Sequence, residues 1–130
     1  MNYLKVEIEE EISSNALEVE RLEKDALREL LDYLDCNFYG GCGSLDSYHM
    51  VGAYRYYDAE FWRLIAEQEE DFVYLLVVDR AWHAWKFERK EDLQVLINET
   101  TAYVFWLLDS TKRVHVYFGD SDCVHRARLE

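Results

Sequence analysis

The feature that most constrains the fold is the run FVYLLVV at residues 72–78, which is apolar throughout. Seven residues are too few to cross a membrane as a helix and match the length of a buried strand. Asp79 and Arg80 separate this run from AWHAWKF at 81–87, which is rich in the aromatic residues that favour strands. The pattern predicts two strands joined by a turn, with residues 72–78 central in a sheet.

Two further elements are predicted before this run. In residues 3–9, Leu4, Val6 and Ile8 alternate with charged side chains, and this period of two is typical of a half-buried strand. Asn15 and Glu18 have the spacing of a capping box. Leucine and alanine residues then recur at helical spacing, so that a helix is predicted over residues 15–35.

The remaining elements are shorter. Residues 36–47 are glycine-rich and predict a loop, and Asp58 is placed to cap a short helix over 61–68. A helix is expected around residues 90–98. Strands are predicted at 48–57, where Tyr48, Met50, Tyr54 and Tyr56 would share one face, and at 102–108 and 113–118 around a four-residue connection. The chain is therefore expected to be a single α+β domain over residues 1–130, with a mostly antiparallel sheet and about three helices. Leu129 and Glu130 resemble a cloning remnant, and we expect no role for them.

Charge and hydropathy exclude several classes of function. The 130 residues carry a net charge of −13, which disfavours direct binding to nucleic acid or anionic lipid. No apolar run approaches the length of a membrane-spanning helix, and the N-terminus lacks a signal-peptide pattern. Cys36, Cys42 and Cys123 make an odd count, which favours free thiols in a reducing compartment. We therefore expect a cytoplasmic protein, without interaction with a membrane.

The negative charge is concentrated in the first half of the chain. Residues 1–71 contain 18 acidic and 6 basic residues, a net charge of −12, whereas residues 72–130 have a net charge of −1. Clusters of acidic residues suit docking on a basic protein, and Tyr and Arg are enriched in the centres of interfaces. The residues predicted to bind a partner are Glu9, Glu10, Glu11, Tyr54, Tyr56, Tyr57, Glu67, Glu69, Glu70 and Asp71. The competing interpretation is that the acids serve solubility and that the tyrosines pack in the core.

Few residues are candidates for catalysis or metal binding. Cys42 lies in a glycine-rich segment seven residues before His49, which loosely suits a thiol nucleophile. With Cys123 and His125 the same residues could supply zinc ligands, although their spacing matches no zinc module. His83 and His115 are expected to be structural. The four tryptophans are expected to lie in the core (Trp62, Trp82, Trp85 and Trp106). Asp120 and Asp122 only weakly resemble a metal or phosphate loop. The sequence contains no Walker, dinucleotide-binding, HExxH or EF-hand motif.

These features favour a small, non-enzymatic binding protein with no cofactor. Proteins that process nucleic acid have basic surfaces, so the expected partner is a toxin or a nucleic-acid-processing protein. The chain would then be an inhibitor, of the immunity or anti-defence type. The alternatives are a small thiol enzyme or zinc site built on Cys42 and His49, and a small-ligand module with a Tyr- and Trp-lined pocket. The oligomeric state is left open.

Overall fold

The computed structural model describes residues 3–100, 103–119 and 121–130 of the chain. These residues form three α-helices and one seven-stranded sheet, which confirms the predicted α+β class. The elements are α1 (Tyr3–Ser14), β1 (Val19–Leu22), α2 (Lys24–Phe38), β2 (Tyr54–Tyr57), β3 (Phe72–Asp79), β4 (Ala81–Phe87), α3 (Lys90–Glu99), β5 (Phe105–Asp109), β6 (Val114–Phe118) and β7 (Cys123–Arg128). Single 3-10 turns occur at η1 (Ser47–His49), η2 (Phe61–Arg63) and η3 (Ile65–Glu67).

The strand order is β1-β4-β3-β5-β6-β7-β2, and every neighbouring pair is antiparallel. β3 lies inside the sheet, where Leu75 is opposite Trp85 of β4 on one side and Leu107 of β5 on the other. A strand with neighbours at both edges and cover on both faces has no solvated side, which explains its unbroken apolar sequence. The predicted strands at 72–78 and 81–87 are confirmed, as is the β5–β6 hairpin. Ala102, at the start of the predicted strand 102–108, lies outside the described residues.

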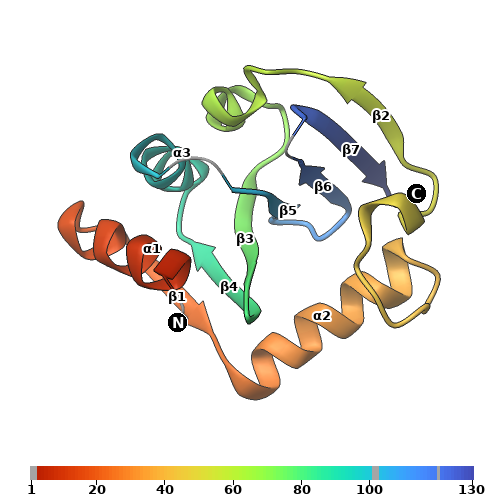
Figure 1. Cartoon of the computed structure of the whole chain (residues 1–130), viewed down its shortest axis with the longest axis horizontal. Coiled ribbons are helices and arrows are strands. Elements are labelled where there is room, and N and C mark those ends of the chain that lie inside the picture. Colours follow the sequence, from red (N-terminus) through yellow and green to blue (C-terminus); the bar gives the residue numbers. More distant parts are fainter. Residues whose placement is uncertain (1–2, 101–102, 120) are drawn as a thin grey trace.

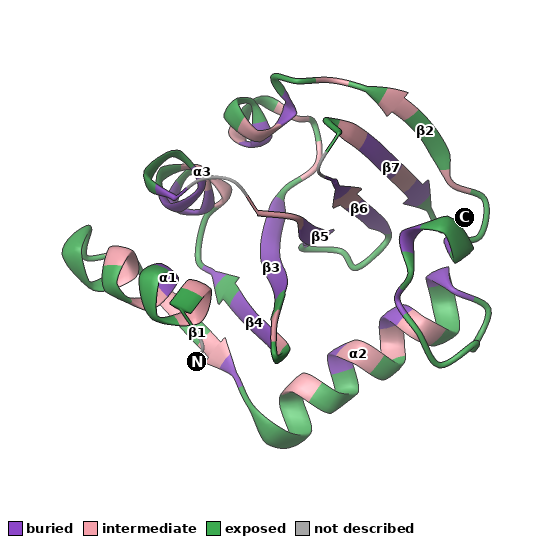
Figure 2. Cartoon of the chain, viewed as in Figure 1, coloured by how far each residue is buried: buried purple, intermediate pink, exposed green. Residues whose placement is uncertain are grey.

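Helices cover both faces of the sheet (Figure 1). α1, α3 and the 3-10 turns η2 and η3 pack on one face, around Ile8, Phe61, Leu75, Trp85 and Leu96. α2 and the loop that follows it pack on the other face, around Leu34, Phe38, Leu45, Leu76 and Trp106. Figure 2 shows β3 buried over most of its length, whereas the N-terminal half of α2 is largely exposed. The protein is therefore a three-layer structure with two cores.

The predicted strand at residues 3–9 is wrong, because this segment belongs to α1. Ile8 is fully buried, and Leu4 and Ile12 pack against the same core. A spacing of four residues is also an even spacing, so the stripe Leu4–Ile8–Ile12 fits both a period of two and one turn of helix. Val6, which would face the core in a strand, is 50% exposed.

The predicted helix at 15–35 is also wrong over its first nine residues, 15–23. Asn15 follows the end of α1, where its side-chain amide donates to the Glu11 carbonyl oxygen. Ala16 has a positive φ that turns the chain, and Val19–Leu22 then pairs with β4 at the edge of the sheet. Pairing with β4 and burial of Leu22 thus override the helical spacing in this segment. α2 starts at Lys24 and continues past the predicted end to Phe38.

Further expectations need correction, and one strand was not predicted. The predicted strand at 48–57 begins only at Tyr54, and Tyr48 lies in the 3-10 turn η1. The short helix at 61–68 is two 3-10 turns rather than one α-helix, although the Asp58 carboxylate does accept from the Glu60 N–H. β7 was not predicted, because its sequence CVHRAR alternates poorly in hydropathy. Leu129 follows β7, donates its N–H to the Arg113 carbonyl oxygen at 2.8 Å and packs on the α2-side core, so it is part of the fold.

The turn between β5 and β6 depends on one buried carboxylate. Asp109 accepts hydrogen bonds from the N–H groups of Arg113 and Val114, at 2.9 and 3.0 Å, and from the Thr111 hydroxyl at 2.7 Å. We predict that Asp109→Ala lowers the free energy of unfolding by about 2 kcal/mol, because it leaves buried donors unsatisfied. Asp109→Asn keeps one acceptor oxygen and should cost less. Urea unfolding measures both, and a loss no larger than that of the exposed control Ser110→Ala would contradict this role.

Within the described part of the chain, none of the helices is both long enough and apolar enough to cross a membrane.

Candidate functional site

The structure divides the predicted partner-binding residues between different parts of the molecule. Glu9, Glu10 and Glu11 lie on α1, on the face of the sheet that α3 also covers. Residues 67–71 precede β3 near the opposite end of that strand, since the Lys5 N–H donates to Asp79 at its far end. Only the second cluster is connected to the tyrosines of β2. The predicted residues therefore do not form one continuous acidic surface.

Arg126 of β7 makes that connection. Its guanidinium donates to the Glu70 carboxylate and to the Gln68 side-chain oxygen, both at 2.9 Å, and its Nε lies 3.4 Å from the Tyr56 hydroxyl oxygen. Arg128 donates to the second Glu70 oxygen at 3.0 Å. The Glu70 side chain is only 11% exposed. Glu70 thus holds the 67–71 segment against β7, and its charge is compensated inside the protein.

The Glu11 carboxylate accepts from the Asn15 side-chain amide at 3.3 Å, and Glu9 is paired with basic residues. The Glu9 carboxylate pairs with Arg21 of β1 and with Lys5 one turn earlier on α1. Glu10 is exposed, as are Glu67, Glu69 and Asp71. None of these four makes an ion pair with another residue that the structure describes. The charge of these four residues is therefore not compensated by an ion pair within the described part of the chain.

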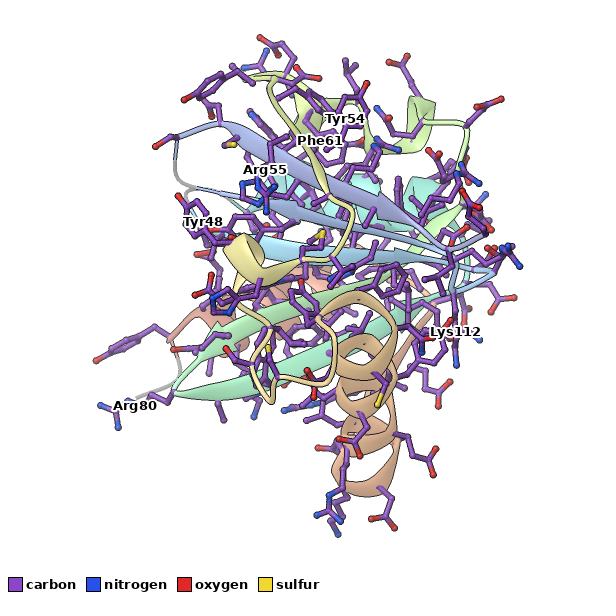
Figure 3. All side chains as sticks on the ribbon, turned by 90° about the vertical axis from the view of Figure 1, so that its right-hand side faces the viewer. Tyr48, Tyr54, Arg55, Phe61, Arg80 and Lys112 are labelled. Carbon is purple, nitrogen blue, oxygen red and sulfur yellow. The ribbon has the colours of Figure 1, made fainter. Side chains whose placement is uncertain are left out.

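The tyrosines lie at a sheet edge. β2 pairs with β7 and with no other strand of the described chain, so one side of its backbone is unpaired. Tyr54 and Tyr57 are 65% and 80% exposed and point to opposite faces, and the rings of Tyr54 and Tyr56 lie 5.4 Å apart. Arg55 donates to the carbonyl oxygens of Ser47 and Tyr48, each at 3.3 Å, which places η1 beside this edge (Figure 3).

A groove lies on the same side of the sheet as α2. We call it the acidic groove and define it by its lining residues Leu31, Asp32, Asp35, Gly43, Ser44, Leu45, Asp46 and Trp82. They come from the C-terminal half of α2, the glycine-rich loop and β4. Its volume is about 540 Å³. Sequence patterns did not indicate this site, because Trp82 lies more than 30 residues away from the other lining residues.

The glycine-rich loop is shaped by the groove's own aspartates. The Asp35 carboxylate accepts from the Gly43 N–H at 3.1 and 3.2 Å, and the Asp46 carboxylate accepts from the Tyr48 N–H at 3.0 Å. Gly43 has φ +83°, a region that residues with a Cβ rarely adopt, so glycine suits this turn. Both carboxylates are therefore held in fixed positions at the wall of the groove.

The start of the loop is anchored through buried polar groups. The Tyr39 hydroxyl donates to Nε2 of His115 at 2.8 Å, and Nδ1 of His115 donates to the Leu107 carbonyl oxygen at 2.8 Å. Burial raises the pKa of Tyr39, so its hydroxyl keeps the proton that it donates. Burial lowers the pKa of His115 to about 4, so the ring is neutral at pH 7. His115 is structural, as expected.

The charge of the groove is uncompensated. Asp32, Asp35 and Asp46 form no ion pair with any residue in the described part of the chain. The sequence contains no Lys or Arg between Arg28 and Arg55. This long cation-free stretch is the one sequence signal that could have pointed to the groove.

The apolar wall of the groove is aromatic. Trp82 is half-buried, and its ring centroid lies 4.7 Å from that of the buried Trp106 in an edge-to-face arrangement. Trp85 and Trp106 are core residues, as predicted, whereas Trp62 and Trp82 are partly exposed. Trp82 therefore contributes an aromatic ring, packed against Trp106, to the lining of the groove.

The residues of the predicted thiol or zinc site lie in different settings. Cys42 is exposed and its Sγ contacts the Ser44 carbonyl oxygen at 3.3 Å, while His49 is exposed in η1. Cys123 lies in β7 opposite Tyr57, and His125 is buried with Nδ1 bonded to the Ser47 carbonyl oxygen.

All three cysteines are free. Within residues 3–100, 103–119 and 121–130, no group of three or more His, Cys, Asp or Glu side chains is arranged to hold a metal ion. Asp120 lies outside the described residues.

Comparison of the chain with protein-family models, curated proteins and solved structures finds no match.

Proposed function

We propose that the chain is a non-enzymatic cytoplasmic binding protein that blocks a basic partner, in the manner of an inhibitor or an immunity protein. The observation that carries the proposal is the net charge of −12 in residues 1–71. Fields of opposite sign speed the encounter of two proteins and disfavour wrong partners.

The contacts within the protein leave most of this charge free. Of the 18 acidic residues in the first 71, ion pairs with other described residues engage Glu9, Glu23, Asp25, Glu60 and Glu70. The other 13 make none, and most of them are exposed. A surface of this kind complements the Lys- and Arg-rich surface with which a protein neutralises phosphates. The partner class that fits it is therefore a nucleic-acid-processing protein or a toxin of that kind.

Capture of the partner from a lysate of the native source, at about 50 and 500 mM salt, tests the proposal. We expect one stoichiometric basic protein, retained at low salt and weakened at high salt. Its activity on nucleic acid should fall when the purified chain is added. If no protein is retained at either salt, or if the captured protein keeps its full activity in the complex, the proposed function is wrong.

A further inference from the structure

The lining of the acidic groove combines two chemical features. Trp82, Leu31 and Leu45 make an apolar surface, and Asp32, Asp35 and Asp46 add three carboxylates that no cation of the described chain neutralises. An occupant must therefore have an apolar or flat body and carry positive charge.

We propose that the acidic groove receives an arginine side chain from the basic partner. This inference rests on the proposed function and assigns its central contact. A guanidinium stacks on an indole face through cation–π attraction, and its planar fork donates to carboxylates in pairs. A lysine ammonium is a compact, strongly hydrated charge and uses the ring face less well.

The chemistry of the groove also argues against a bare metal ion. The described residues offer no group of three or more His, Cys, Asp or Glu side chains arranged to hold one. A volume of about 540 Å³ is large for an ion and ample for a side chain. An organic cation several ångströms long can contact separate carboxylates at once.

The groove is built in advance of binding. Asp35 and Asp46 are already held by the N–H groups of Gly43 and Tyr48, and Trp82 is held against Trp106. Side chains fixed before association lose less conformational freedom when the ligand binds. The groove should therefore bind even a single arginine measurably.

Amide NMR titration with the peptide acetyl-Gly-Arg-Gly-amide at low salt tests this. We expect saturable shifts at the Trp82 indole and at residues 43–46, with a Kd on the order of 1 mM. The Lys peptide should bind at least threefold more weakly. The citrulline peptide, which has the shape of arginine without its charge, should not saturate. Shifts spread evenly over all exposed acids, or equal binding of the citrulline peptide, would overturn the proposal.

Two matched variants separate the groove from general electrostatics. D32N/D35N/D46N and E10Q/E67Q/E69Q change the net charge equally, and asparagine keeps an acceptor oxygen for Gly43 and Tyr48. The first variant should weaken binding of the Arg peptide at least fivefold, and the second should weaken it less than twofold. The Asp32 carboxylate has no hydrogen bond to lose within the described chain. Asp32→Asn alone should therefore weaken binding of the Arg peptide at least twofold with no change of fold. If both triple variants weaken binding of the Arg peptide equally, the groove is not the arginine site. The broader proposal of an acidic binding surface would not be affected.

Discussion

Replacing Glu70 by alanine is expected to lower the free energy of unfolding by about 3 kcal/mol. The Glu70 side chain is 11% exposed and that of Arg126 is 17% exposed, so the substitution leaves a largely buried guanidinium without its carboxylate. Removing one partner of a buried ion pair is far more costly than removing a surface pair. The loss also frees the 67–71 segment from β7, where Arg126 and Arg128 hold it. Urea unfolding gives the value.

Glu69→Ala is the matched control, since Glu69 is the exposed neighbour and makes no ion pair with the described residues. It should change stability by less than about 0.5 kcal/mol. In a double-mutant cycle, Glu70→Ala with Arg126→Ala should cost clearly less than the two single changes together. Additive losses would contradict the ion pair. Glu70 is in either case unsuitable for charge-reversal tests of binding, because a loss of binding could reflect a loss of folding.

Stability is expected to fall by about 3 kcal/mol between pH 7 and pH 4 through His115 alone. The pKa of His115 is about 4 in the folded protein, against 6.5 for an unburied imidazole, because burial disfavours the charged ring. Between these pH values the unfolded chain binds a proton that the folded protein does not. Stability therefore rises with pH across this range and is unaffected by His115 above about pH 7.

His115→Gln tests this, because glutamine can hydrogen-bond but does not titrate. The variant is expected to be less stable than the wild type at pH 7, since it packs less well beside Phe38 and Tyr39. The informative quantity is the difference between the two proteins, measured by urea unfolding at pH 7 and pH 4. That difference should shrink by about 3 kcal/mol at the lower pH. If the stabilities of the two proteins instead change in parallel between pH 7 and pH 4, burial does not lower the pKa of His115.

The elements that the sequence predicted correctly are those whose length and hydrophobic pattern fit only one type of secondary structure. The run at 72–78 is too short for a buried helix of ordinary length and has aromatic strands beside it, and the helix at Lys90–Glu99 places Leu93, Leu96 and Ile97 on one face. The prediction for α1 was wrong because Leu4, Ile8 and Ile12 fit both the period of two of a strand and the turn of a helix. The strand β1 was missed because its local sequence favours a helix. Pairing of its four residues with β4 outweighs that preference, and β4 lies too far along the chain for a local pattern to include it.

The candidate site was less predictable than the fold. Charge clusters are visible in the sequence, but their internal partners are not: Arg126 lies 56 residues from Glu70, and Arg21 lies 12 from Glu9. The acidic groove joins α2, the glycine-rich loop and Trp82, which meet only when the sheet forms. The sequence feature that corresponds to the groove is the absence of Lys and Arg between Arg28 and Arg55.

The most direct test of the central claim is the association rate constant of the purified chain with its captured partner, measured by stopped flow at several salt concentrations. An acidic protein that engages a basic surface through long-range fields should associate at least about tenfold more slowly at 500 mM than at 50 mM salt. Dissociation should change less, because contacts within the formed complex are screened less by salt. An association rate constant that varies less than twofold across this range would contradict the account.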